Sequence, residues 1–109
     1  MSVVTIRAHR RYAVRGPIQL ARQDGTSSPG LMIEVAAHGC RISNLQGVEF
    51  QPGEKIKITS DDGFEFAASV RWAHDGVAGI KLDQPLHARQ MAQIVGAMRG
   101  EDDARRYGT

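Results

Sequence analysis

Apolar and polar residues alternate along most of this chain, and the alternation predicts short β-strands. Between the alternating stretches stand Gly, Pro, Asp and Ser residues. They include Asp62-Gly63 and Asp75-Gly76, which are typical of tight hairpin turns. We therefore expect about six strands, at residues 17–22, 31–36, 40–43, 54–59, 64–72 and 77–82.

The second of these stretches predicts which side chains face the core. Successive side chains of a strand point to opposite faces, so Leu31, Ile33 and Val35 share one face, which we expect to be buried. The even-numbered residues, Glu34 among them, then project from the exterior. Gly39 follows at a corner, where we expect it to adopt a positive φ.

Aromatic residues in the fifth stretch share one face with aliphatic residues. Packing in the core explains this face better than a platform for stacking bases does, and a binder of single-stranded nucleic acid would need exposed aromatic residues. The strand parity therefore places Trp72 inside. The residues of this face are Phe64, Phe66, Ala68, Val70 and Trp72.

The period changes after residue 82, where apolar residues recur at helical spacing. The stripe predicts one amphipathic helix that begins near Asp83 as its cap, with Pro85 in its first turn, and ends at Gly100. The stripe consists of Met91, Ile94, Val95 and Met98.

These elements predict a mostly β fold, a six-stranded antiparallel β-barrel with a C-terminal α-helix packed on one side or end. We expect a flexible basic arm over residues 1–16, the barrel and helix over 17–99, and a loose tail over 100–109.

Composition narrows the class of protein. The 109 residues suffice for one domain, with 41% hydrophobic and 24% charged residues as in ordinary globular proteins. The sequence has no apolar run long enough to span a membrane and no pattern of a secretory signal. The single cysteine, Cys40, excludes an internal disulfide, so we expect a cytoplasmic protein.

Catalytic and metal-binding patterns are missing from the sequence. The four histidines and Cys40 lack the spacing of metal ligands. Neither a nucleophile elbow nor a glycine-rich phosphate loop occurs. We therefore predict a protein that is not an enzyme and carries no metal or cofactor.

Positive charge is concentrated at the start of the chain. The first 23 residues hold five arginines and no acidic residue, whereas the remainder holds nine basic and twelve acidic residues. This asymmetry indicates an anionic partner. Arg10, Arg11 and Arg15 stand out, because guanidinium groups bind phosphates in a two-pronged manner and pair with or stack on purines.

Glu34 offers a second half for such a site. An outward carboxylate can accept both N1–H and N2–H of a guanine, and Gly39 would allow a ligand or a backbone to approach closely. With the arginines, this arrangement resembles the PilZ domain family. The family's motifs are an arginine pair with Arg-x-x-x-Arg, then acid-x-small-x-x-Gly, here Arg10-Arg11, Arg11/Arg15 and Glu34/Ala36/Gly39. Residues 68–86 resemble the family's last two strands and the start of its closing helix.

The resemblance implies a non-catalytic receptor for cyclic di-GMP, a bacterial second messenger. It assigns the phosphates and guanines to Arg10, Arg11 and Arg15, and a guanine edge to Glu34 and Gly39. An arginine placed like Arg10 accompanies the binding of two intercalated ligand molecules. In some members a tryptophan placed like Trp72 lies near the ligand. The resemblance therefore makes Trp72 a candidate binding residue, whereas the strand alternation assigns it to the core.

Two departures from the family pattern keep alternatives open. Glu34 stands where the family usually has Asp or Asn, and Ala36 replaces a serine. We expect weakened rather than abolished binding, with an output to an unidentified effector of motility or exopolysaccharide production. The alternatives are a ligand-free adaptor of the same fold, and a small barrel that binds RNA or single-stranded DNA.

Overall fold

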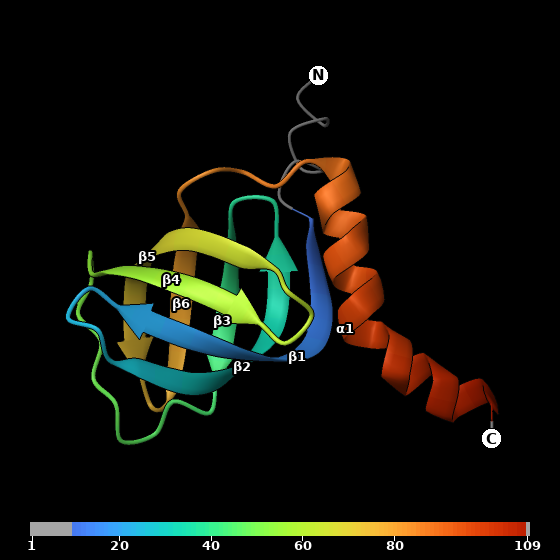
Figure 1. Cartoon of the computed structure of the whole chain (residues 1–109), viewed down its shortest axis with the longest axis horizontal. Helices are drawn as coiled ribbons and strands as arrows, with labels where there is room; N and C mark the ends of the chain where they lie inside the picture. The colour runs from blue at the N-terminus through green and yellow to red at the C-terminus, as the bar shows by residue number, and fades with distance from the viewer. Residues whose placement is uncertain (1–9, 109) are drawn as a thin grey trace.

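The computed structural model describes the backbone of residues 10–108 and the side chains of residues 10–99. Six antiparallel strands form one closed barrel in the order β1-β2-β3-β6-β5-β4, followed by one helix (Figure 1). The predicted fold is therefore confirmed. The elements are β1 (Arg11–Arg22), β2 (Ser27–Ala36), β3 (Gly39–Ser43), β4 (Lys55–Ser60), β5 (Glu65–His74), β6 (Val77–Leu82) and α1 (Ala88–Gly108).

The predicted hairpin turns connect β4 to β5 and β5 to β6. Gly63 has a φ of 93°, and Ser60 Oγ accepts hydrogen bonds from the backbone N–H groups of Asp62 and Phe64. Asp75 and Gly76 have φ values of 55° and 78°, as a two-residue hairpin turn with positive φ at both positions requires. Local turn chemistry therefore sets these two connections.

The first strand is longer than the sequence indicated. Residues 11–16, which the sequence places in the arm, form the first half of β1, where Arg11–Ala13 and Gly16 pair with β2 on either side of a register shift. Residues 1–9 of the expected arm lie outside the described part of the chain.

A β-bulge in β2 makes our prediction of its core face wrong at Leu31 and Ile33, whereas Val35 is buried as expected. Met32 pairs with Ile42 and Glu34 pairs with Arg41, so β2 has one residue, Ile33, more than β3 has. The extra residue shifts the phase of the strand. Met32 and Val35 are each 1% exposed, whereas Ile33 is only half-buried. Glu34 nevertheless stays on the exterior, as expected.

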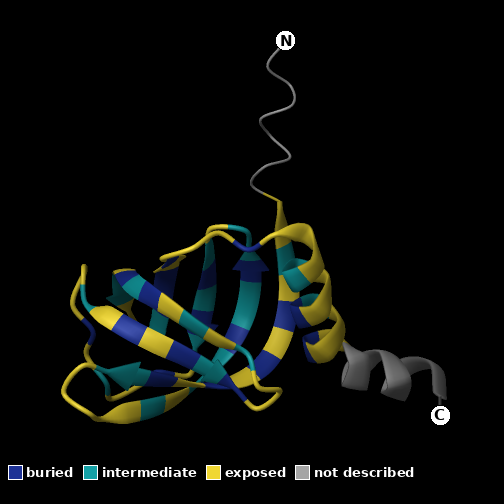
Figure 2. Cartoon of the chain, turned by 45° about the horizontal axis from the view of Figure 1, so that its top comes forward, coloured by how far each residue is buried: buried dark blue, intermediate teal, exposed yellow. Residues whose placement is uncertain are grey.

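A second bulge, in β5, makes the core prediction for Trp72 wrong as well. Val70 pairs with Ile80 and Trp72 pairs with Gly79, so Arg71 is the extra residue. Val70 is buried, Arg71 is exposed and Trp72 is half-buried. Figure 2 shows this alternation of buried and exposed positions along the strands. Arg71 is outward by ordinary alternation, and the bulge brings Trp72 to the outer surface beside it.

The helix differs from the prediction at both ends. It begins at Ala88, where the backbone N–H of His87 donates to Gln90 Oε1 and His87 Nδ1 accepts from the Gln90 N–H in a reciprocal cap. Asp83 does not cap it and instead pairs with Lys55 at 3.2 Å. The preceding segment is held against the β2–β3 turn, because the Leu86 N–H donates to Ala37 O. The helix also continues past Gly100 through the expected tail.

The helix packs beside β1, and the barrel interior forms the core (Figure 1). Ile94 and Met98 of the predicted stripe are buried, and Met91 and Val95 pack partly against the core. Arg99 Nε donates a hydrogen bond of 2.7 Å to Ala13 O, which fastens the helix to the first half of β1. No helix within residues 10–108 has the length and apolar character needed to cross a membrane.

Candidate functional site

Two rows of outward positions run around the barrel. Cross-strand pairing aligns each residue with a partner on the next strand, so a row collects side chains distant in sequence. The first row contains Arg11, Ala36, Gly39, Lys81, Ser69 and Lys55. The second row contains Ala13, Glu34, Arg41, Gly79 and Trp72.

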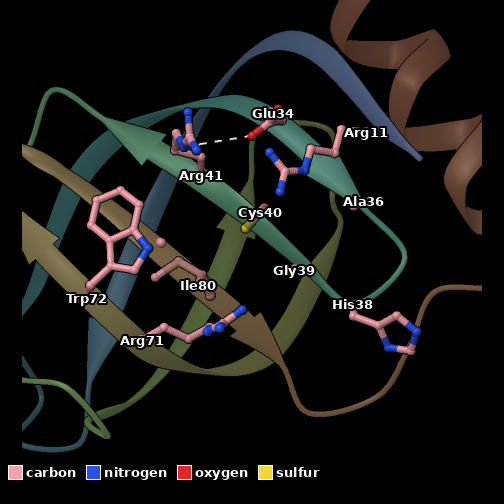
Figure 3. Close-up of a pocket in the computed structure, with 11 residues that line it drawn as sticks. Arg11, Glu34, Ala36, His38, Gly39, Cys40, Arg41, Arg71, Trp72 and Ile80 are labelled. Carbon is pink, nitrogen blue, oxygen red and sulfur yellow. Dashed lines mark ion pairs between the residues drawn. The ribbon is translucent and has the colours of Figure 1, made fainter. Parts of the chain in front are cut away.

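Small residues in the middle of both rows leave a hollow between larger ones. The hollow is a cavity of about 200 Å³ on the outer face of the barrel (Figure 3). The residues that line it come from β1, β2, β3, β5, β6 and the β2–β3 turn. They are Arg11, Glu34, Ala36, His38, Gly39, Cys40, Arg41, Arg71, Trp72, Gly79 and Ile80.

The lining is positively charged. The lining contains three guanidinium groups, those of Arg11, Arg41 and Arg71, and one carboxylate, that of Glu34, so the arginines exceed the carboxylate by two positive charges. Arg41 Nε lies 3.7 Å from Glu34 Oε1, and the guanidinium of Arg11 extends from β1 toward the same carboxylate (Figure 3). The arrangement can attract an anion and still offer one strong hydrogen-bond acceptor.

Two glycines make this surface possible for steric reasons. A Cβ on Gly39 would overlap the carbonyl oxygen of Ile80 on β6, so the close approach of β3 and β6 requires glycine. A Cβ on Gly79 would overlap the indole of Trp72, which lies across that position. Our prediction of a positive φ at Gly39 is wrong, because the residue is part of the regular β3 strand.

Cys40 lies beneath the cavity and is chemically inert there. Its side chain points into the core, and the residue is 8% exposed. Burial raises the pKa of its thiol to about 12. The thiol is therefore neutral at physiological pH and offers neither a nucleophile nor a charge to the cavity.

Four of the six candidate residues meet at this cavity, namely Arg11, Glu34, Gly39 and Trp72. Arg10 and Arg15 are exposed and do not line it, and the Arg10 guanidinium lies 5.1 Å from the Tyr12 ring centroid.

Sequence reasoning missed Arg41 and Arg71, which also line the cavity. Arg41 alternates with the buried Cys40 and Ile42 and lies opposite Glu34. The outward position of Arg41 was therefore available from the strand pattern. The outward position of Arg71 was available in the same way, because Arg71 alternates with the buried Val70, and only the outward position of Trp72 depends on the bulge.

A larger cavity of about 980 Å³ lies between the β3–β4 loop and the β5–β6 turn. It contains none of the candidate residues. The Arg22 guanidinium at its edge is engaged by Glu54, with Nε–Oε2 at 2.5 Å and Nη2–Oε1 at 3.0 Å. Since its one arginine is neutralised, this cavity lacks the positive charge of the first cavity.

Within the described residues, no cluster of three or more His, Cys, Asp or Glu could hold a metal ion.

The closed six-stranded barrel with one helix defines a small antiparallel β-barrel domain. The PilZ domain model matches residues 5–100, and the chain therefore belongs to the PilZ domain family. PilZ domains are non-catalytic receptor domains, and the family is one of cyclic di-GMP receptors.

Solved structures share the fold. The PilZ domain of CeSA from a cellulose-synthesizing bacterium superposes with a TM-score of 0.62 at 16% identity, over 85% of this chain and 98% of that chain. The Bacillus subtilis inhibitor of motility (MotI/DgrA) superposes with a TM-score of 0.61 at 15% identity, over 89% of this chain and 52% of that chain. No curated protein matches the sequence.

Proposed function

We propose that this chain is a receptor for cyclic di-GMP and that the cavity at Glu34 holds one of its guanines. The observation that carries the proposal is the meeting of Arg11 and Glu34 at one positively charged cavity. The excess of two positive charges matches the two phosphodiester groups of the ligand. A carboxylate at the same place suits the two N–H donors of a guanine edge.

The size of the cavity indicates how the ligand would lie. A volume of about 200 Å³ is smaller than the ~300–1,000 Å³ of sites that enclose a whole ligand. One base would enter between Glu34 and Trp72, over the floor at Gly39, and the phosphates would remain at the rim. Arg11 lies at that rim. Arg10 and Arg15 are exposed on the same strand or beside it and would bind the phosphates or a second ligand molecule.

Signalling would follow from closure of the leading segment. Because Arg11–Ala13 already pair with β2, closure would involve Arg10 and the segment before it, which lies outside the described residues. Neutralisation of its arginines by the phosphates would hold this segment across the Glu34 surface and form a composite surface for a partner protein. An effector of motility or exopolysaccharide production would suit such an output. Backbone amide shifts during a titration would report both the location of the ligand and the closure.

Calorimetry with cyclic di-GMP at moderate salt tests the proposal. We expect heat of binding at tens of micromolar folded protein, and a flat titration under these conditions contradicts the proposed function. An oligonucleotide titrated in parallel tests RNA or single-stranded DNA binding. Binding to the nucleic-acid backbone would show a steep salt dependence with little base preference.

Ala36 supports a second candidate, an adaptor of this fold that has lost the ligand. It lies in the cavity lining without the hydroxyl that the family usually has there. The missing hydrogen bond corresponds to about 0.5–1.5 kcal/mol, or about two- to tenfold in affinity. The double variant Ala36→Ser, Glu34→Asp separates the two functions. Binding that occurs only in the double variant supports the adaptor, and binding by the natural chain supports the receptor.

A further inference from the structure

Arg41 and Glu34 form a pair of opposite hydrogen-bonding character on the cavity surface. They are Cα partners on β3 and β2 and both project outward. Their side chains are 43% and 27% exposed, so both reach solvent in the cavity. Within the described residues no hydrogen bond uses the Glu34 carboxylate or the Arg41 guanidinium. Apart from their mutual ion pair at 3.7 Å, a ligand would therefore meet one acceptor group beside one donor group.

Trp72 holds Arg41 from the other side. The Arg41 Cζ lies 5.8 Å from the centre of the Trp72 ring, within the range of a cation–π contact. The ring itself lies across Gly79, which is the Cα partner of both Arg41 and Trp72. The guanidinium is thus held between a carboxylate and an indole, and Figure 3 shows the three side chains along one side of the cavity.

This order of groups matches the pairing edge of guanine and opposes that of adenine. Guanine presents the acceptor O6 next to the donors N1–H and N2–H, so O6 would face Arg41 while both donors face Glu34. Adenine presents its amino donor where guanine has O6, and an unprotonated N1 where guanine has N1–H. The amino group would then face the Arg41 donors, and N1 would face the Glu34 carboxylate, which is also an acceptor.

We propose that Arg41 is a specificity-determining residue, which with Glu34 selects guanine over adenine in the bound dinucleotide. The proposal rests on the proposed function. It assigns a role to a residue outside the two motifs that the sequence displays. A site with polar groups arranged for one base rejects another because those groups would lose their partners.

The test compares cyclic di-GMP with cyclic di-AMP in titrations followed by amide shifts, which also detect weak binding. Arg41→Met keeps the aliphatic stem and removes the donors, and Arg41→Lys keeps the charge but not the planar fork. Lys57→Ala is the matched control, because Lys57 belongs to another outward cross-strand ion pair, with Glu65 at 3.4 Å, and does not line the cavity.

We expect Arg41→Met to weaken cyclic di-GMP binding about tenfold and to change cyclic di-AMP binding by no more than about twofold. Arg41→Lys should weaken cyclic di-GMP binding by an intermediate factor. Lys57→Ala should bind both ligands as the natural chain does. Equal losses for both ligands would contradict the proposal and indicate general charge attraction. Tighter cyclic di-GMP binding by Arg41→Met would also contradict it, since Arg41 would then compete with the ligand for Glu34. If the natural chain binds no cyclic di-GMP, the proposed function and this inference both fail.

Discussion

The indole of Trp72 lies across Gly79 on the neighbouring strand, so that any side chain at position 79 would displace it. The tryptophan therefore owes its place at the cavity to the absence of a Cβ one strand away. Since it is the only tryptophan of the chain, its fluorescence reports on this place alone.

We expect cyclic di-GMP to shift the Trp72 emission to shorter wavelength, because a base in the cavity would cover a half-exposed ring. Gly79→Ala should change the emission of the ligand-free protein and weaken binding. An unchanged spectrum on saturation, with binding established by calorimetry, would show that the ligand does not reach Trp72.

Gly39→Ala should destabilise the fold, because the added methyl group would overlap the backbone carbonyl of Ile80. Overpacking against backbone costs about 1–3 kcal/mol, which corresponds to a decrease in Tm of about 5–15 °C. Gly96→Ala is the matched control. Gly96 lies in α1 with open space at its Cβ position, and alanine should raise the free energy of unfolding by about 0.5–1 kcal/mol. Similar melting curves for both variants would contradict the predicted strand contact.

Arg11→Ala should reduce cyclic di-GMP binding at least tenfold and leave Tm nearly unchanged, because Arg11 lines the cavity and is exposed. Arg15→Ala should also reduce binding without loss of stability, although Arg15 does not line the cavity of the ligand-free structure. Calorimetry and thermal melts measure the two quantities separately. A large decrease in Tm for either variant would mean that the arginine is structural.

Glu54→Gln should lower stability at neutral pH and have less effect in acid. The hydrogen bond from Arg22 holds the pKa of Glu54 below its ordinary value, so ionised Glu54 stabilises the folded state. This stabilisation is present above the ordinary glutamate pKa of about 4.3 and is lost as pH falls through the lowered value.

At pH 7 we expect a loss of about 1 kcal/mol for Glu54→Gln in denaturant unfolding, since the pair is partly exposed. The difference from the natural chain should disappear once Glu54 is protonated. Glu65→Gln, which breaks an exposed pair with Lys57, should change stability little at either pH. A pH-independent difference for Glu54→Gln would contradict the charged pair.

Cys40 should resist thiol reagents in the folded protein, because burial raises its pKa to about 12 and leaves almost no thiolate at pH 8. Denaturant should restore reaction. Fast labelling of the folded chain would show that the strand around Cys40 opens readily.

Most strands and turns of the fold could be predicted from local patterns in the sequence. Alternation located all six strands, and Asp-Gly pairs located two hairpin turns, because both depend on near neighbours. The helix stripe was equally visible. Its N-terminus was not predicted correctly. The local cap between His87 and Gln90 was overlooked, and the predicted cap Asp83 is engaged by Lys55, which is far away in sequence.

The orientation of the candidate site residues was predicted correctly only where inward and outward side chains alternate regularly along the strand. Glu34 was placed outside correctly, although the bulge at Ile33 reversed the faces before it. Trp72 was placed wrongly, because the bulge at Arg71 depends on pairing with β6 and leaves no local mark in the sequence. Arg41 could have been found from the register across the β2–β3 turn, which brings it opposite Glu34.

The bulge at Arg71 has a consequence for the outer surface of the barrel. The extra residue in β5 turns outward a tryptophan that alternation assigns to the interior, and so adds an indole to the cavity beside Arg71. With regular pairing at this point, the same strand would keep its indole packed within the barrel and present a different face to solvent. One residue of strand pairing is therefore enough to change which side chains such a barrel presents, a difference that a comparison of aligned substitutions alone would overlook.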